Sequence, residues 1–242
     1  MTIRNAYEFA LIECNKLKAP ALLLEDYIYL FNKAIQQYVN SVYNRAEYNQ
    51  QSSDDLGWLQ VAKKLNNGNN SENFNGNITT FDLPDDYLHL LNCKARISNK
   101  KIIKNRCEDK ELTVSNLVNC SRLTANLDGG ITGNYYNKPS HRKPYYYIIN
   151  RSSDQSNPSI EIHLGESKYT VDEVQLTYLR SPKYVSMTQE DLLSVEDNTQ
   201  VLEFPDYVCY EIINIYVRLL LENASDPRLS TVTPINQSIA VG

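Results

Sequence analysis

Apolar residues recur at helical spacing towards both ends of the chain and alternate with polar residues in its middle. Residues 7–17 keep a spacing of three and four, and a longer run after Pro20, residues 27–42, does the same. This spacing predicts two amphipathic helices. A third helix is predicted from about Ser53, which is a suitable N-cap and is followed by two Asp residues that favour a first helical turn.

Strict alternation of apolar and polar side chains marks the middle of the chain. Residues 160–164 and 174–178 alternate in this way. Residues 145–149, a run of Tyr and Ile, are predicted to be a third strand, and turn-forming segments separate the three. Such alternation is typical of half-buried antiparallel strands. The short turns between the three segments favour a β meander as the simplest topology.

Two segments have less regular patterns. The Asn-rich residues 66–77 have almost no apolar periodicity, and we interpret them as a loop. Residues 98–143 have no consistent period and are not assigned, apart from a possible short helix at residues 113–119.

Residues 202–222 form a run with apolar side chains on most sides. On a helical wheel the apolar arc spans roughly 240°, where a helix on one core needs only somewhat more than 100°. The polar side chains fall on one narrow stripe: Glu211, Asn214, Arg218 and Glu222. These charges exclude a membrane span. We therefore expect a helix with apolar partners on two sides, either within its own chain or shared with a neighbouring subunit.

Together these patterns predict an α+β fold. The N-terminal helices, residues 1–66, and the C-terminal helix, residues 205–223, are expected to form one helical layer. A mainly antiparallel β region, residues 78–185, is inserted between them. Residues 224–242 contain two Pro residues and only spaced apolar side chains, so we expect an extended arm that orders against a partner.

Composition and charge narrow the classes of function. The chain has 242 residues, of which 42% are hydrophobic, and a net charge of −5. An acidic chain is a poor candidate for binding nucleic acid through a basic face. Its N-terminus has acidic residues inside an amphipathic pattern and no secretory signal is expected. The five Cys residues are odd in number and dispersed, which favours reduced thiols in a cytoplasm.

The sequence contains no recognisable catalytic or metal-binding motif. His163 alternates with apolar neighbours, which predicts a solvated surface side chain. The pairs Asp54–Asp55, Asp85–Asp86 and Glu190–Asp191 are each interpreted as acids at a helix start, where the helix dipole favours them. We expect no catalytic residue, cofactor or metal, and no enzymatic activity.

Three segments resemble a known group of proteins: EDYIYLFNKAIQQYVNSVYNRAEYNQQSSDDL near the start, TTFDLPDDYLHLLN in the middle, and VDEVQLTYLRSPKYV followed by LEFPDYVCYEIINIYVRLLLE near the end. The most specific part is a strand ending in Tyr178-Leu179-Arg180-Ser181-Pro182, then a loop, then a helix led by Phe204-Pro205-Asp206. These segments resemble the head-to-tail adaptor, or connector-ring, proteins of tailed bacteriophages. The group includes podovirus tubular tail protein A, and the likeness is closest to ring proteins of crAss-like phages.

The resemblance implies a structural subunit of the virion. Such a protein forms a homo-oligomeric ring, usually twelvefold, between the portal protein and the tail or other ring proteins. DNA passes through the ring during genome ejection without specific binding, and no membrane is involved. The protein would be assembled in the host cytoplasm and reside at the head–tail junction.

A ring also predicts residues at a subunit interface. The resemblance and the breadth of the C-terminal helix together indicate these nine: Tyr178, Arg180, Pro182, Tyr210, Ile213, Val217, Leu220, Leu229 and Ile235. The alternative function is a soluble binding or enzymatic domain whose site has no motif in the sequence.

Overall fold

The computed structural model has two compact units. One consists of residues Met1–Leu59 and Pro182–Gly242, and the other of Gln60–Ser181. The structure describes residues 1–14, 23–46, 49–66, 68–73, 76–104, 109–124, 136–149, 158–166 and 168–223. The predicted C-terminal arm, residues 224–242, lies outside these described residues.

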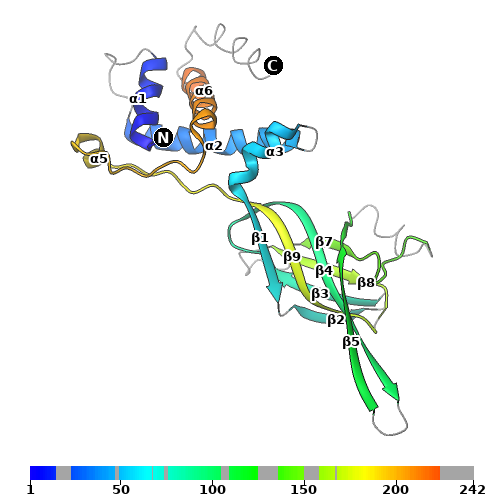
Figure 1. Cartoon of the computed structure of the whole chain (residues 1–242). Coiled ribbons are helices and arrows are strands. Elements are labelled where there is room, and N and C mark those ends of the chain that lie inside the picture. The colour runs from blue at the N-terminus through cyan, green and yellow to red at the C-terminus, as the bar shows by residue number, and fades with distance from the viewer. Residues whose placement is uncertain are drawn as a thin grey trace. The chain divides into compact units, whose positions relative to one another are not determined.

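The fold class is α+β, which confirms the prediction from the sequence (Figure 1). The first unit contains α1 (Ile3–Glu13), α2 (Leu24–Ala46), α3 (Gln50–Leu56), the 3-10 helix η1 (Gly57–Leu59), α5 (Gln189–Leu193) and α6 (Asp206–Asn223). The second unit contains β1 (Gln60–Asn66), β2 (Asn69–Asn73), β3 (Gly76–Asp82), β4 (Tyr87–Lys104), β5 (Asp109–Asn119), β6 (Ser121–Arg122), β7 (Tyr145–Ile149), β8 (Ser159–Leu164) and β9 (Thr170–Arg180).

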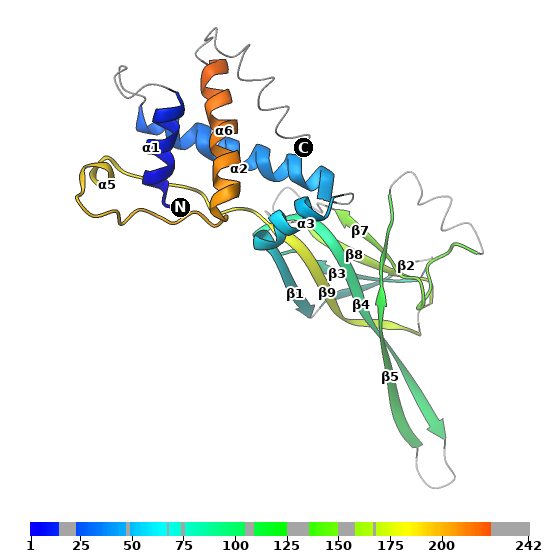
Figure 2. The ribbon, with the colours of Figure 1, turned by 45° about the horizontal axis from the view of Figure 1, so that its top comes forward.

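Helix α6 packs within its own chain against both α1 and α2. Figures 1 and 2 show α1 and α6 crossing α2. Buried aromatic rings join α2 to α6: the ring of Tyr27 lies 5.2 Å from that of Tyr216, and the ring of Phe31 lies 6.0 Å from the same ring. The two apolar partners that the width of α6 requires are therefore supplied by α1 and α2.

The third helix begins and ends earlier than predicted. Its N-cap is Asn49, whose side chain accepts a hydrogen bond from the backbone N–H of Gln51, so Ser53 lies inside the helix. Residues 60–66, which were expected to continue the helical layer, form β1 and pair antiparallel with β9. Strand pairing in the tertiary structure has overridden the helical spacing of this segment.

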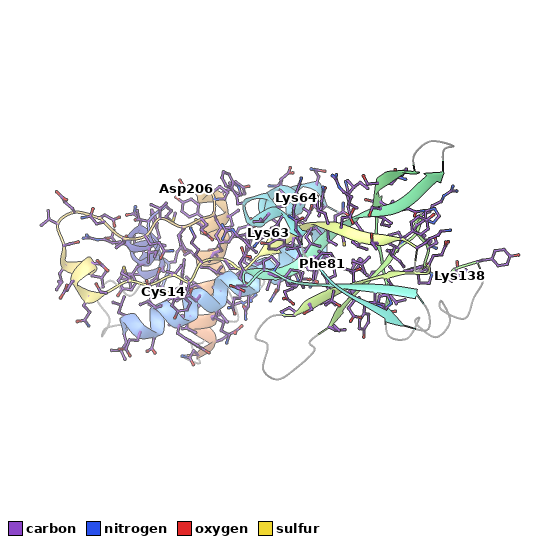
Figure 3. The ribbon with its side chains drawn as sticks, turned by 90° about the horizontal axis from the view of Figure 1, so that it is seen from below. Cys14, Lys63, Lys64, Phe81, Lys138 and Asp206 are labelled. Carbon is purple, nitrogen blue, oxygen red and sulfur yellow. The ribbon has the colours of Figure 1, made fainter. Side chains whose placement is uncertain are left out.

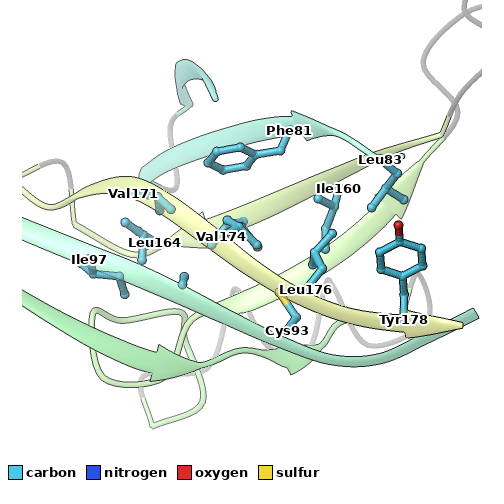
Figure 4. Close-up of a cluster of buried hydrophobic side chains, with 12 residues drawn as sticks. Phe81, Leu83, Cys93, Ile97, Ile160, Leu164, Val171, Val174, Leu176 and Tyr178 are labelled. Atoms are coloured by element: carbon cyan, nitrogen blue, oxygen red, sulfur yellow. The ribbon is translucent and has the colours of Figure 1, made fainter. Parts of the chain in front are cut away.

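The strands form two sheets that enclose one core. The first sheet has the order β1-β9-β4-β5, and the second has the order β2-β3-β8-β7-β6. Inward side chains from β3, β8, β4 and β9 form a buried cluster (Figure 4), which is built mainly from alternating apolar positions. This arrangement is a β-sandwich.

The predicted meander is correct for two of its three strands. β7 pairs antiparallel with β8 as expected, but β9 belongs to the other sheet, where it lies between β1 and β4. A local turn pattern does not determine which sheet receives a strand when two sheets face each other across one core.

Two segments that were interpreted differently are strands. The polar run at residues 66–77 contributes β2 and the start of β3, which pair as a hairpin. Residues 113–119 were a possible helix but form the end of β5, paired with β4. Hydrogen bonds to a neighbouring strand order both segments. Their own residues do not alternate between apolar and polar, so the sequence pattern did not predict strands there.

Strand β4 is longer than the sheet to which it belongs. It pairs with β9 only as far as Ser98, and beyond this point residues 99–104 pair with residues 109–114 of β5 alone. The result is a two-stranded ribbon that extends past the other strands in Figures 1 and 2. We refer to this pair of segments as the ribbon.

Candidate protein-interaction surfaces

The described residues contain no cluster that resembles a metal site. No group of three or more His, Cys, Asp or Glu side chains in the described part of the chain could hold a metal ion. Of the three acid pairs interpreted as helix starts, only Glu190–Asp191 lies in a first helical turn, that of α5. Asp54–Asp55 lies at the end of α3, and Asp85–Asp86 lies in the turn between β3 and β4.

His163 is not the solvated surface residue that its alternation predicted. Its side chain is only 20% exposed, and its Nε2 lies 3.3 Å from Oε2 of Glu161, which is still more buried. Both side chains lie on the face of β8 opposite the core, because Ile160, Ile162 and Leu164 occupy the core face. Among the residues described, this pair is not part of a group of three or more His, Cys, Asp or Glu side chains that could hold a metal ion.

Four of the predicted interface residues are buried within a single chain. Tyr178 belongs to the sandwich core, where its hydroxyl donates a hydrogen bond to Asp86 Oδ1 at 2.8 Å. Ile213, Val217 and Leu220 lie in the interior of the helical unit. These four side chains are buried within the subunit and cannot contact a neighbouring subunit. The prediction that they lie at a subunit interface is therefore wrong.

The other predicted interface residues have different environments. Arg180 and Pro182 are half-buried, and Tyr210 is exposed on α6. Leu229 and Ile235 fall outside the described residues. Of the nine, Tyr210 is therefore the one apolar side chain that the described structure places on a surface.

Tyr210 belongs to an exposed apolar patch that spans two helices. Its ring contacts that of Phe9 on α1 edge to face, with 5.8 Å between the ring centroids. Ile12 follows Phe9 by one helical turn and is exposed like it, whereas the hydroxyl of Tyr207, one turn before Tyr210, donates to Asp55 Oδ1 on α3 at 2.8 Å. We refer to Phe9, Ile12 and Tyr210 as the helical patch. Contiguous exposed apolar side chains of this kind mark contacts with other proteins.

A second exposed surface lies on the segment between β9 and α6, residues 182–205, which we refer to as the strap. The strap has almost no regular structure, yet several hydrogen bonds fix it to the helical unit. The Asn32 side chain donates to the carbonyl of Val185 and accepts from its N–H, both at 2.9 Å. Arg4 donates to the carbonyl of Ser194 at 2.7 Å. Backbone bonds join the last part of the strap to Met1 and Ile3.

The middle of the strap is folded locally as well. Thr188 and Asp191 form a capping box around the first turn of α5, and the backbone N–H of Thr188 holds the pKa of the Asp191 carboxyl below its usual value. Immediately after α5, the Ser194 hydroxyl donates to backbone carbonyls of Asp191 and Glu196. The local backbone is therefore held in one shape without a large core.

This fixed backbone displays apolar side chains to solvent. Leu193 is 85% exposed and Val195 is 100% exposed, on either side of the anchored Ser194. Buried Val185 and Met187 on the preceding part of the strap show that the segment also has apolar contacts with its own unit. A backbone held by so many bonds, with its apolar side chains turned outward, is arranged for contact with another protein.

A third surface is the outer edge of β5. The opposite edge of that sheet, β1, has Lys63 and Lys64 exposed (Figure 3), and charged side chains on an edge discourage strand addition. Residues 114–119 of β5 carry no charge and no Pro, and Val114 and Leu117 are exposed. No strand among the described residues pairs with this edge, so it is a candidate for the addition of a partner strand.

These surfaces favour contacts between proteins. No helix in the described part of the chain is long and apolar enough to cross a membrane. Comparison of the chain with protein-family models gives no match, and comparison with curated proteins gives none either. The helical patch, the strap and the β5 edge are therefore the features from which a functional interpretation starts. The strap was not predicted from the sequence; the spaced apolar side chains in the acidic segment DLLSVED are the signal that could have indicated it.

Proposed function

We propose that the protein is a structural component of a tailed-phage virion, a subunit of the connector ring that joins the portal to the tail and surrounds the DNA channel. The observation that carries this proposal is the strap. An irregular segment that is hydrogen-bonded into one shape, with Leu193 and Val195 almost fully exposed, is expected in a protein whose partners complete its packing.

The order of elements around the strap also supports the proposal. The resemblance to connector-ring proteins depends on a strand ending in Tyr178-Leu179-Arg180, then a connecting segment, then a helix led by Pro205-Asp206. β9 ends at Arg180, the strap follows, and α6 begins at Asp206. The Asp206 carboxylate lies 2.7 Å from the N-terminal ammonium group of Met1, which fixes the start of the helix.

The ribbon fits the same function. A ring subunit contacts neighbours on two sides and further proteins above and below, and a two-stranded ribbon reaches such partners at some distance from the core. At about 3.4 Å per residue, the six residues of β4 that extend past the sheet, 99–104, reach roughly 20 Å. The uncharged part of β5, residues 114–119, lies at the base of the ribbon and offers a partner a backbone to pair with.

Quantitative mass spectrometry of purified virions tests this proposal. The particles come from the phage whose genome encodes the chain. We expect the chain in the particle fraction, in about as many copies as the portal subunit. A chain confined to the soluble lysate of infected cells would contradict the proposal and favour the alternative of a binding or enzymatic domain.

A further inference from the structure

Cys93 and Cys120 are brought together by the pairing of β4 with β5. In this antiparallel pair Lys94 lies opposite Asn119, so Cys93 and Cys120 are the next residues to face each other. The backbone confirms the pairing, since the N–H of Cys120 donates to the carbonyl of Cys93 at 2.9 Å. Two cysteines that looked dispersed in the sequence are therefore direct cross-strand neighbours.

The geometry of this pair suits a covalent cross-link. Residues directly opposite in an antiparallel ladder have their side chains on the same face, with Cα atoms about 4.5–5.5 Å apart. Disulfides span Cα distances of about 4.4–6.8 Å. The two thiols are in contact, because the Cys93 side chain is hydrogen-bonded to that of Cys120.

The position of the pair gives a cross-link a structural effect. Cys93 is buried in the sandwich core (Figure 4), and Cys120 is half-buried and packs against the same cluster. Cys120 lies between β5 of the first sheet and β6 of the second. The chain passes from one sheet to the other at this residue, and the ribbon lies between the two cysteines in the sequence.

We propose that Cys93 and Cys120 form a disulfide site, open as two thiols under reducing conditions and closed by thiol–disulfide exchange with a small-molecule disulfide such as oxidised glutathione. The Cys120 thiolate attacks one glutathione sulfur and releases the first glutathione thiolate. The Cys93 sulfur, after losing its proton to water, attacks Cys120 Sγ and releases the second. The two protein thiols lose two electrons, and one glutathione disulfide becomes two glutathione thiols.

The order of attack follows from exposure. Cys120 is the partly accessible thiol, whereas Cys93 is enclosed by the core. The hydrogen bond to Cys120, together with burial, raises the pKa of the Cys93 thiol well above its usual value. Since the thiolate is the nucleophile, Cys93 reacts second, and ring closure is the slow step.

Closure stabilises the second unit. The disulfide encloses the segment that runs from Cys93 through the ribbon to Cys120, and a loop of this length restricts the unfolded chain substantially. The expected effect is a rise in the melting temperature of the second unit by about 5 °C or more.

The test uses the full-length protein and its Cys120→Ser variant, with Cys107→Ser as the matched control that removes a different cysteine. Each is incubated with oxidised glutathione, digested without reduction and mapped by mass spectrometry, and the melting temperature is measured before and after addition of dithiothreitol. We expect a peptide linked through Cys93 and Cys120, with the mass of two hydrogen atoms lost, in the wild type and Cys107→Ser. We expect no such peptide in Cys120→Ser.

A higher melting temperature that dithiothreitol reverses, in the two proteins that form the link and not in Cys120→Ser, supports the site. Three results would overturn it: a glutathione adduct on Cys120 that never closes, a disulfide between other cysteines, or a link that leaves the melting temperature unchanged. A Cys93→Ala variant covers the case in which Cys120→Ser fails to fold.

Discussion

At the scale of single residues, Tyr178 illustrates what an alternating pattern can predict. The alternation of β9 placed Tyr178 correctly with the apolar side chains of its strand. It did not indicate which surface covers them, and the residue was assigned to a subunit interface. Tyr178 is instead in the sandwich core, where its ring lies 5.9 Å from that of Tyr87 and its hydroxyl reaches Asp86.

The environment of Tyr178 predicts a dependence of stability on alkaline pH. Burial, with a smaller contribution from the hydrogen bond to Asp86, raises the pKa of Tyr178 to about 12 from its usual value near 10. Because the folded pKa is higher, the folded state holds this proton more tightly. The contribution is complete below pH 10 and is lost as the pH rises from about 10 to 12, by on the order of 2 kcal/mol.

Urea unfolding followed by circular dichroism at pH 9 and pH 11.5 measures this effect, with Tyr178→Phe as the comparison. The wild type should lose more free energy of unfolding between the two pH values than the variant, which has no hydroxyl to titrate at this position. An equal loss in both proteins would contradict the assigned pKa.

At the scale of elements, α6 was predicted most completely. Its expected bounds, 205–223, differ by one residue from Asp206–Asn223, and Glu211 and Glu222 of the predicted polar stripe are exposed. The apolar arc was wide enough to require two partners, but an arc cannot identify them. Helix α1 supplies the second partner, so the width of α6 no longer argues for a neighbouring subunit.

The burial of α6 predicts different outcomes for two similar substitutions. Ile213→Asp places an unpaired charge at a position that is 2% exposed, which should cost more than about 3 kcal/mol and unfold the helical unit. Tyr210→Asp, one turn earlier and exposed, should remain folded. Far-UV circular dichroism and native mass spectrometry compare them. A folded, monomeric Ile213→Asp protein would contradict the internal position of the helix.

The strands that have a clear apolar pattern in the sequence were predicted, and those without one were not. β8 and β9 alternate clearly and were recognised, because one face of each meets the core. β7 was recognised from its continuous run of Tyr and Ile, which are strand-forming residues. β2 is Asn-rich, and the sequence of β1 also fits a helical spacing, so neither has a pattern that separates strand from loop or helix. Their partners, β3 and β9, are what order them.

The strap gives a prediction about assembly. The double variant Leu193→Asp, Val195→Asp removes two exposed apolar side chains. It should shift the melting temperature by no more than about 2 °C, because neither side chain packs within the subunit. The same variant, supplied from a plasmid during infection, should fail to enter particles. Asn198→Asp is the control, since it adds a negative charge to the same strap, one where the test variant adds two, without removing an apolar side chain.

Normal incorporation of the Leu193→Asp, Val195→Asp protein would show that the strap is not an assembly contact. A control variant that is also excluded from particles would show that added charge alone prevents assembly, and this result too would remove the role assigned to the two apolar side chains.

At the scale of the whole molecule, the chain leaves the helical unit at Leu59 and returns to it at Pro182. The sequence predicted this insertion of a β region between helices. It could not predict that Thr2 would pair with Val201, or that Leu202 would donate to the carbonyl of Met1 at 3.0 Å. Contacts between residues about 200 positions apart depend on the completed packing and have no local pattern.

The charge of the molecule predicts its behaviour towards DNA. The net charge is −5, and the densest basic stretch, residues 98–106, lies in the neighbourhood of the ribbon, partly outside the described residues. Binding to a duplex requires many Lys and Arg side chains on one face and weakens steeply with salt. Fluorescence anisotropy with a labelled duplex should detect no complex at physiological salt, and a salt-sensitive complex of micromolar affinity would contradict this expectation.

Native mass spectrometry of the purified chain mixed with the purified portal ring of the same genome tests the central claim most directly. A connector ring should add twelve copies of the 27.8 kDa chain, about 334 kDa, to the mass of the portal. The Leu193→Asp, Val195→Asp variant should add none. A portal whose mass is unchanged by an excess of the folded wild-type chain would contradict the proposal that this protein is a connector subunit.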